Sequence, residues 1–345
     1  MTATPSPADP RAEQARAWAC SALALGQAEF APASADASFR RYFRLTGGGR
    51  SWIVMDAPPQ HEDCRPFVRI AALLREAGVH VPAVLAQDLE QGYLLLDDLG
   101  TQTFLDVIRG LQPGPEAEAR IDGLFEAAIE ALVLWQKASR PGVLPPYDEA
   151  LLRRELNLFP EWYLGRHLGI ELPAADAAAL EGVFRQLVAA ALAQPQVYVH
   201  RDYMPRNLML SDPNPGVLDF QDAVYGPLAY DAVSLFRDAF WSWPAARVDW
   251  GLRRYHARAA AAGLPVPAWD AFKRDSDWIG LQRHLKVAGI FARLTLRDGK
   301  PKYLADTPRF LRYMLEVAPA YAELAPLAEL LQRHVLPRAP AAPAA

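Results

Sequence analysis

Cysteine is scarce in this 345-residue chain, which contains only Cys20 and Cys64. Two isolated cysteines exclude a disulfide framework and a clustered zinc site, and they fit a reducing compartment. Apolar runs also fall short of the roughly 18 residues that a membrane-spanning helix needs. The first residues lack the cationic start and apolar core of a secretory leader. We therefore expect a cytoplasmic protein that does not enter a membrane.

The chain has no excess of positive charge either, since its formal net charge is -4. A nucleic-acid binder needs a cationic surface to neutralise phosphates, so we expect no nucleic-acid partner. Hydrophobic residues make up 51% of the chain and charged residues 22%, a composition typical of globular proteins, and the length favours two lobes. Residues 1–12 and 337–345 are rich in Pro and Ala and are predicted to be mobile tails.

Hydrophobic periodicity changes along the chain and predicts an α+β fold. The first part reads as a helix over 13–30, a hairpin of 38–45 and 51–55, a helix over 62–77, and strands near 84–86 and 93–96. The glycine triplet Gly47–Gly49 predicts the hairpin turn, because glycine tolerates positive φ. Beyond residue 101 the pattern is mainly helical, apart from one β-rich insert over 197–220, which we read as a hairpin. We expect a β-rich lobe at 13–98, a hinge near 96–101 and a larger helical lobe at 99–336.

The β-rich insert contains the chemical motif of the chain. His200-Arg201-Asp202 is followed by Asn207 and, twelve residues later, by Asp219-Phe220, the spacing of the catalytic and metal loops of kinases. Phosphoryl transfer needs a hydroxyl aimed in line at phosphorus and cations that balance the developing charge. We predict Asp202 as the catalytic base and Asn207 and Asp219 as oxygen ligands of Mg²⁺.

These segments, with Gly226-Pro227-Leu228-Ala229-Tyr230-Asp231, resemble the aminoglycoside phosphotransferase and choline kinase family over nearly the whole chain. Residues 36–44, 54–59 and 282–291 are similar to one branch of it, the anomeric N-acetylmuramate and N-acetylglucosamine kinases of peptidoglycan recycling. The resemblance implies a bilobal protein-kinase-like fold, ATP and Mg²⁺ as cofactors, and an amino sugar as the small-molecule partner. The product would be a sugar 1-phosphate, which a uridylyltransferase converts to a UDP-sugar. A hemiacetal hydroxyl is acidic enough for a carboxylate base such as Asp202.

Two usual kinase features are missing, a glycine-rich loop near 34–39 and a lysine in the strand 52–56. Backbone amides around Ser38 are expected to cradle phosphate, and strand alternation places Arg40 and Arg44 on one face as replacement cations. Asp56 stands near the position of the missing lysine. It would repel phosphate unless an arginine pairs with it, so it points either towards Arg40 or towards the sugar.

The nucleotide base and the acceptor are assigned to other segments. Residues 94–100 look like the interlobe strand, and the backbones of Asp97 and Leu99 are predicted to read the adenine edge. Residues 277–302 carry six Lys or Arg against two Asp, which favours a neutral or anionic acceptor over a polycation. An arginine there would clamp the lactyl carboxylate of muramate. The predicted substrate-binding residues are Glu155, Trp162, Arg283 and His284, whereas Asp231 is expected to hydrogen-bond the catalytic loop.

Three alternatives remain open. The same chemistry would serve another acceptor, such as a different amino sugar or an amino alcohol. The missing lysine and glycine loop motivate a non-catalytic, nucleotide-binding pseudokinase, against which the intact Asp202, Asn207 and Asp219 weigh. A protein kinase is disfavoured because no closing A-P-E follows Asp219.

Overall fold

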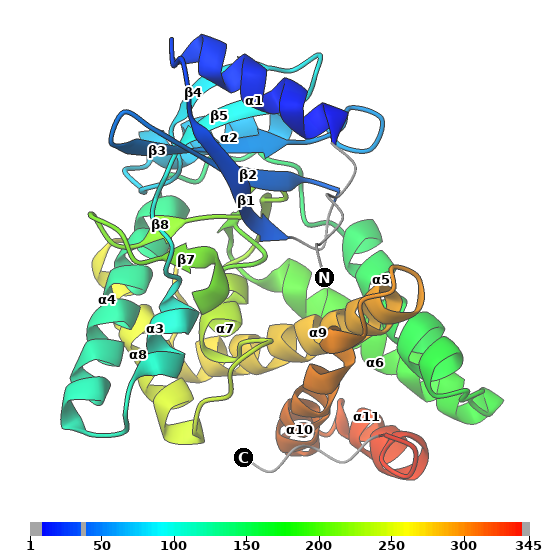
Figure 1. The fold of residues 1–345 in the computed structure, drawn as a ribbon. Helices are drawn as coiled ribbons and strands as arrows, with labels where there is room; N and C mark the ends of the chain where they lie inside the picture. Colours follow the sequence, from blue (N-terminus) through cyan, green and yellow to red (C-terminus); the bar gives the residue numbers. More distant parts are fainter. Residues whose placement is uncertain (1–8, 36–38, 340–345) are drawn as a thin grey trace. The chain divides into compact units, whose positions relative to one another are not determined.

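The computed structural model describes residues 9–35 and 39–339, and the chain divides into two compact units. The first unit comprises Met1–Gln102 and Met209–Gln221, and the second comprises Thr103–Leu208 and Asp222–Ala345. Figure 1 shows the long strands in the N-terminal part of the chain, which also carries helices, and a mainly helical remainder that includes short strands. Among the described residues, each helix is either too short or too polar to span a bilayer.

The first unit is built on a five-stranded antiparallel sheet with strand order β1-β2-β3-β5-β4. Its elements are α1 (Pro10–Ala22), β1 (Glu29–Ala35), β2 (Arg41–Gly47), β3 (Arg50–Asp56), α2 (Arg65–Glu76), β4 (Val84–Asp88) and β5 (Tyr93–Asp97). The predicted hairpin is confirmed, because β2 and β3 pair through a turn in which Gly48 and Gly49 have φ of 58° and 75°. Glycine adopts that conformation without the steric cost that a side chain would add.

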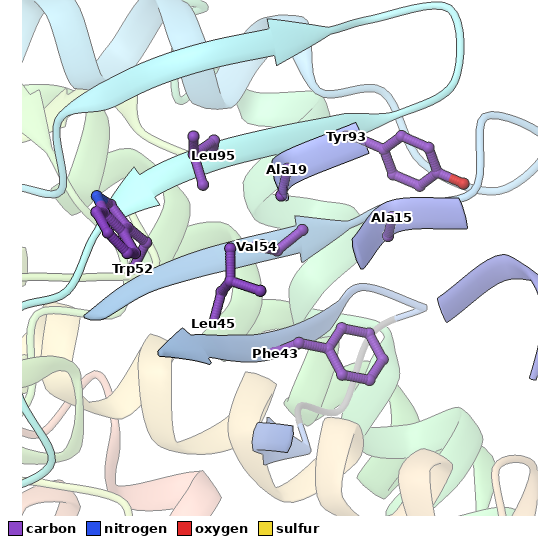
Figure 2. Packing of buried hydrophobic residues seen from close by; sticks show 8 residues of the cluster. All are labelled: Ala15, Ala19, Phe43, Leu45, Trp52, Val54, Tyr93 and Leu95. Atoms are coloured by element: carbon purple, nitrogen blue, oxygen red, sulfur yellow. The ribbon is translucent and has the colours of Figure 1, made fainter. Parts of the chain in front are cut away.

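Helix α1 packs on one face of this sheet through small residues (Figure 2). Ala15 and Ala19 are fully buried and lie in one cluster with Phe43, Leu45, Trp52, Val54, Tyr93 and Leu95. The predicted helix over 13–30 is wrong in its second half, since α1 ends at Ala22 and β1 begins at Glu29. Pairing with β2 overrides the local propensity there, and Phe30 of β1 stacks on Phe43 at 4.6 Å.

The second unit is mainly helical, with α9 (Trp269–Leu296) as its central element. Every residue from 276 to 289 is buried, because the surrounding helices contact α9 along its length. The remaining helices are α3 (Phe104–Gly110), α4 (Pro115–Lys137), α5 (Glu149–Leu156), η1 (Phe159–His167), α6 (Ala174–Ala193), α7 (Tyr230–Phe236), α8 (Ala245–Ala261), η3 (Pro301–Asp306), α10 (Thr307–Val317), η4 (Ala318–Ala320), α11 (Ala325–Leu330) and η5 (Leu331–Val335).

The sequence predicted that the β-rich insert is one hairpin, and that prediction is wrong. Strand β6 (Gln196–Val199) pairs with β9 (Val224–Pro227), whereas β7 (Leu208–Met209) pairs with β8 (Gly216–Val217). The short helix η2 (Pro205–Asn207) lies between β6 and β7. The motif residues therefore occupy the connections between two small ribbons, and the partner of β6 comes from beyond Asp219.

Candidate active site

The predicted catalytic loop lies in the second unit, directly after β6. The carboxylate of Asp231, at the start of α7, accepts the backbone N–H of His200 at 2.7 Å and that of Arg201 at 3.0 Å. Burial raises the pKa of Asp231 to about 7, and these two donors act in the opposite direction. Arg201 has φ of 76°, a conformation that costs energy for any residue other than glycine. Asp231 thus holds a strained backbone immediately before Asp202, which confirms the hydrogen bond expected for it.

Asn207 closes the same loop from its other end. Its side-chain Nδ2 donates to the backbone carbonyl of Asp202 at 2.9 Å, and its N–H donates to Met204 at 2.8 Å. Since the amide nitrogen has this partner, Oδ1 is the atom that would bind a cation. The side chain of Asp202 is partly exposed, whereas Asn207 is 9% exposed.

Below the loop, Glu155 is the centre of a buried ionic cluster. It ion-pairs with Lys286 at 3.0 Å and with Arg201, and it accepts hydrogen bonds from Gln282 at 3.0 Å and from Tyr147. Burial alone would raise the pKa of Glu155, but the positive charges of Lys286 and Arg201 outweigh it and lower the pKa to about 2. Arg201 also donates to the carbonyl of Asp222 at 3.3 Å. The cluster ties α5 and α9 to the residue preceding Asp202.

The other predicted substrate-binding residues do not gather around Glu155. Arg283 and His284 are each 1% exposed and interact with the backbone carbonyl of Arg237, on a different side of α9 from Gln282 and Lys286. Burial, with the charges of Arg283 and Arg237, lowers the pKa of His284 well below its ordinary value. Trp162 lies in η1, where the guanidinium of Arg166 stacks on its ring at 3.9 Å. Whether any of them contacts substrate stays a prediction.

The first unit carries the predicted second metal ligand. Asp219 has φ of 62°, and its carboxylate accepts Gln221 Nε2 at 2.9 Å. Arg40 Nη2 lies 3.8 Å from the same carboxylate, so a predicted phosphate cation and a predicted metal ligand are neighbours. Phe220 is fully buried and packs on Phe67, with ring centroids 4.7 Å apart, which anchors the loop.

Arg44, the other candidate cation, is engaged elsewhere. Its guanidinium binds Asp98 through two nitrogens, at 2.6 and 3.1 Å, and the carbonyl of Gly100 at 2.7 Å. The N–H of Asp97 donates to the carbonyl of Ala83, directly before β4, at 3.1 Å. Leu99 lies beyond the end of β5, and its backbone makes no hydrogen bond within the described residues. Ser38 lies outside them.

The carboxylate of Asp56 binds two arginines that were not predicted from the sequence. It is fully buried, and its oxygens accept Arg11 Nε at 2.7 Å and Arg41 Nε at 2.9 Å, rather than a nitrogen of Arg40. The hairpin register contained the signal for one of them, since Arg41 stands directly opposite Asp56. Arg11 comes from α1, 45 positions away, and no local pattern indicates it.

Comparison with known proteins places this geometry in a family. Residues 29–273 match the family model described as "Phosphotransferase enzyme family". The N-acetylmuramate/N-acetylglucosamine kinase of Pseudomonas aeruginosa is 60% identical over 305 residues, which cover 88% of either chain. The kinase of the same name from Neisseria meningitidis is 51% identical over 87% of this chain and 88% of its own.

Solved structures show the same fold at low identity. The ADP-bound aminoglycoside phosphotransferase APH(2'')-Ib has a TM-score of 0.59 at 12% identity, covering 89% of this chain and 98% of that one. A choline/ethanolamine kinase family protein from Mesorhizobium loti has a TM-score of 0.59 at 17% identity. The match covers 92% of this chain and 99% of that one. The predicted α+β, protein-kinase-like fold is confirmed. This chain belongs to the phosphotransferase enzyme family.

Proposed function

We propose that this protein transfers the γ-phosphoryl group of ATP to the anomeric hydroxyl of N-acetylmuramate and N-acetylglucosamine, as a step of peptidoglycan recycling. The observation that carries the proposal is the loop of Asp202, which Asp231 and Asn207 hold from both ends in a chain of the phosphotransferase family. The relatives at 60% and 51% identity bear the name of this activity. Residues 13–98 would bind the nucleotide, and residues 99–336 would supply the base and select the sugar.

Asp202 would accept a hydrogen bond from the C1 hydroxyl, orient it towards phosphorus and take its proton late in the transfer. Its backbone has little freedom, because the preceding N–H groups are bound to Asp231 and its own carbonyl is bound to Asn207. Positioning of this kind supplies much of the rate in phosphoryl transfer, where the protein does little covalent chemistry.

The two predicted ligands, Asn207 in the second unit and Asp219 in the first, each have donor chemistry that suits Mg²⁺. Both residues offer hard oxygens, and the carboxylate of Asp219 is 31% exposed. The part of the chain that the structure describes holds no group of three or more His, Cys, Asp or Glu side chains suited to a metal. Phosphate oxygens and water would therefore complete the coordination, as is usual for Mg²⁺. The bound ion would offset the negative charge of the phosphates.

Arg40 is the stronger candidate for the cation that replaces the strand lysine. Its guanidinium already lies 3.8 Å from Asp219, whereas Arg44 binds both Asp98 and Gly100. Leu99 is the stronger candidate for reading adenine, since the N–H of Asp97 is already bonded to the carbonyl of Ala83. We assign Glu155 to positioning of Arg201 rather than to the sugar, because both of its oxygens have protein partners.

The test is ADP release from ATP and Mg²⁺ with four acceptors in parallel: N-acetylmuramate, N-acetylglucosamine, choline and kanamycin. Turnover with the two acetylated sugars alone is expected. Turnover with only choline or kanamycin would support a kinase but contradict a sugar acceptor. No ADP release with any of the four acceptors would favour the pseudokinase, and nucleotide binding without turnover would then establish it.

A further inference from the structure

Three arginines of the second unit converge beside the catalytic loop, and the mechanism above uses none of them. Arg206 belongs to η2, Arg109 to α3 and Arg309 to α10. Arg206 Cζ lies 4.4 Å from the centre of the Phe240 ring, and Arg109 Nη2 lies 3.5 Å from the Phe240 carbonyl. All three act on one carboxyl group, Asp306: burial raises its pKa, and Arg309, Arg109 and Arg206 lower it. Three guanidinium groups therefore act on Asp306, and one of them, Arg309, also acts on the buried carboxyl of Asp238.

Arg206 is the member that a ligand can reach. It is partly exposed, and within the described ranges its guanidinium makes neither an ion pair nor a hydrogen bond. A guanidinium stacked on an aromatic ring keeps its N–H donors in the plane, where two of them match a carboxylate. Arg206 also precedes Asn207, whose side chain returns to the backbone of Asp202. An anion held by Arg206 would lie on the loop that carries the base.

Arg309 supplies a second, incompletely satisfied cation. Its Nη2 lies 3.2 Å from Asp306, but Nε and Nη1 are buried without a hydrogen-bond partner among the residues described. Buried donors without partners are costly, so such sites are normally completed by water or a ligand. Arg283 is also incompletely bonded, but it is 1% exposed and donates to the Arg237 carbonyl. Arg206 and Arg309 are thus better placed for a substrate anion than Arg283.

The surroundings suit a sugar. Phe240 and Trp241 are partly exposed in the connection between α7 and α8, and Trp241 meets Trp243 edge to face at 5.9 Å. Ring faces beside a few placed polar groups are typical of small-molecule sites. N-acetylmuramate differs from N-acetylglucosamine by a lactyl ether that ends in a carboxylate, so a protein acting on both must accommodate that charge.

Resting on the sugar-kinase function proposed above, we infer that Arg206 and Arg309 form the subsite for the lactyl carboxylate of N-acetylmuramate. The subsite is empty of substrate charge when N-acetylglucosamine binds, so the two arginines select between the acceptors. They do not take part in phosphoryl transfer.

The unmutated protein provides the first test. The methyl ester of N-acetylmuramate keeps the shape of the side chain but lacks its charge. We expect kcat/KM for the ester to lie about tenfold or more below that for the free acid, a factor in the range of a charge-assisted hydrogen bond. Equal values for acid and ester would overturn the subsite.

Variants locate the subsite. Arg309→Gln and Arg206→Gln are expected to lower the ratio of kcat/KM for N-acetylmuramate over N-acetylglucosamine by about ten- to a hundredfold. Arg206→Lys keeps the charge but not the two-point geometry. Its kcat/KM ratio should therefore lie between those of the unmutated protein and of Arg206→Gln. The control is Arg253→Gln, whose side chain pairs with Asp249 on α8 and which should leave the ratio unchanged. An unchanged ratio in both glutamine variants, or equal losses with both sugars, would overturn the inference. Failure of the function proposed above looks different, since the unmutated protein would then turn over neither sugar.

Discussion

Asp202 owes its position to residues that need not touch a substrate. Asp231 accepts the backbone N–H groups of the two residues that precede Asp202, His200 and Arg201. Glu155 binds the side chain of Arg201. Arg201 is thus held through both its backbone and its side chain while its φ is unfavourable. At the scale of single residues, this is how the fold converts a short motif into a fixed carboxylate.

Replacement of Asp202 tests its role as the base. Asp202→Asn keeps the size of the side chain but cannot take a proton, so we expect kcat to fall by about 10²- to 10⁴-fold while ATP still binds. The measurement pairs coupled ADP release with nucleotide titration by calorimetry. Asp249→Asn, on the exposed part of α8, is the control. Turnover in Asp202→Asn comparable to that of the unmutated protein would contradict the assignment of Asp202 as the base.

Glu155 predicts a pH dependence of stability. Its pKa is about 2 in the folded chain against an ordinary 4.5, so its stabilisation is complete above pH 4.5 and is lost as pH falls towards 2. The loss is on the order of 3 kcal/mol. Urea unfolding between pH 5 and pH 3 should show this decline, and Glu155→Gln should flatten it while lowering stability at pH 7 by about 3–5 kcal/mol. An identical pH profile in the variant would show that Glu155 does not contribute to the decline.

The spacing of the motif singles out Asp202, Asn207 and Asp219 in the sequence, and their roles remain proposals. Most of the residues that hold the motif in place could not be predicted in that way. Glu155 was singled out with a different role, since its partner Gln282 lies 127 positions away and leaves no periodic signal. The pairing of Asp56 with Arg41 was open to prediction from the hairpin register.

At the scale of elements, glycine decides how closely α9 approaches η1. A Cβ added at Gly289 would come within 2.4–2.6 Å of the carbonyl carbon, the carbonyl oxygen and Cβ of Leu158. Moving these backbone atoms away costs more free energy than moving the end of a flexible side chain. We expect Gly289→Ala to destabilise the chain by about 1–3 kcal/mol through overpacking. Urea unfolding measures the change.

Gly123 provides the matched control, since it is helical in α4 and a Cβ there would meet nothing within 4 Å. Gly123→Ala should stabilise the chain by up to about 1 kcal/mol through the helix preference of alanine. Equal effects of the two substitutions would contradict the packing argument.

Elements with strong local signals were predicted well, and those that depend on distant pairing were not. The hairpin β2–β3 was confirmed around Gly48, and α2 ends before Gly78, whose φ is 82°. Strand β1 was missed because its identity depends on β2. The β-rich insert was misread because β6 pairs with a strand beyond Asp219.

At the scale of the whole molecule, the order of a β-rich part before a helical part was visible in the periodicity. The return of Met209–Gln221 to the first unit was not. That segment is held by backbone hydrogen bonds from Leu210 to Gln102 and from Val217 to His80, both 2.8 Å, and such contacts over more than 100 positions have no sequence pattern. The segment brings Asp219 beside Arg40, within one unit.

The central claim is transfer of the γ-phosphoryl group to the anomeric oxygen, and phosphorus NMR of the product tests it most directly. With N-acetylglucosamine labelled with ¹³C at C1, we predict a phosphate signal split by the labelled carbon. A phosphate signal without that coupling would place the group on another hydroxyl, and ATP consumption with no sugar phosphate would contradict sugar phosphorylation altogether.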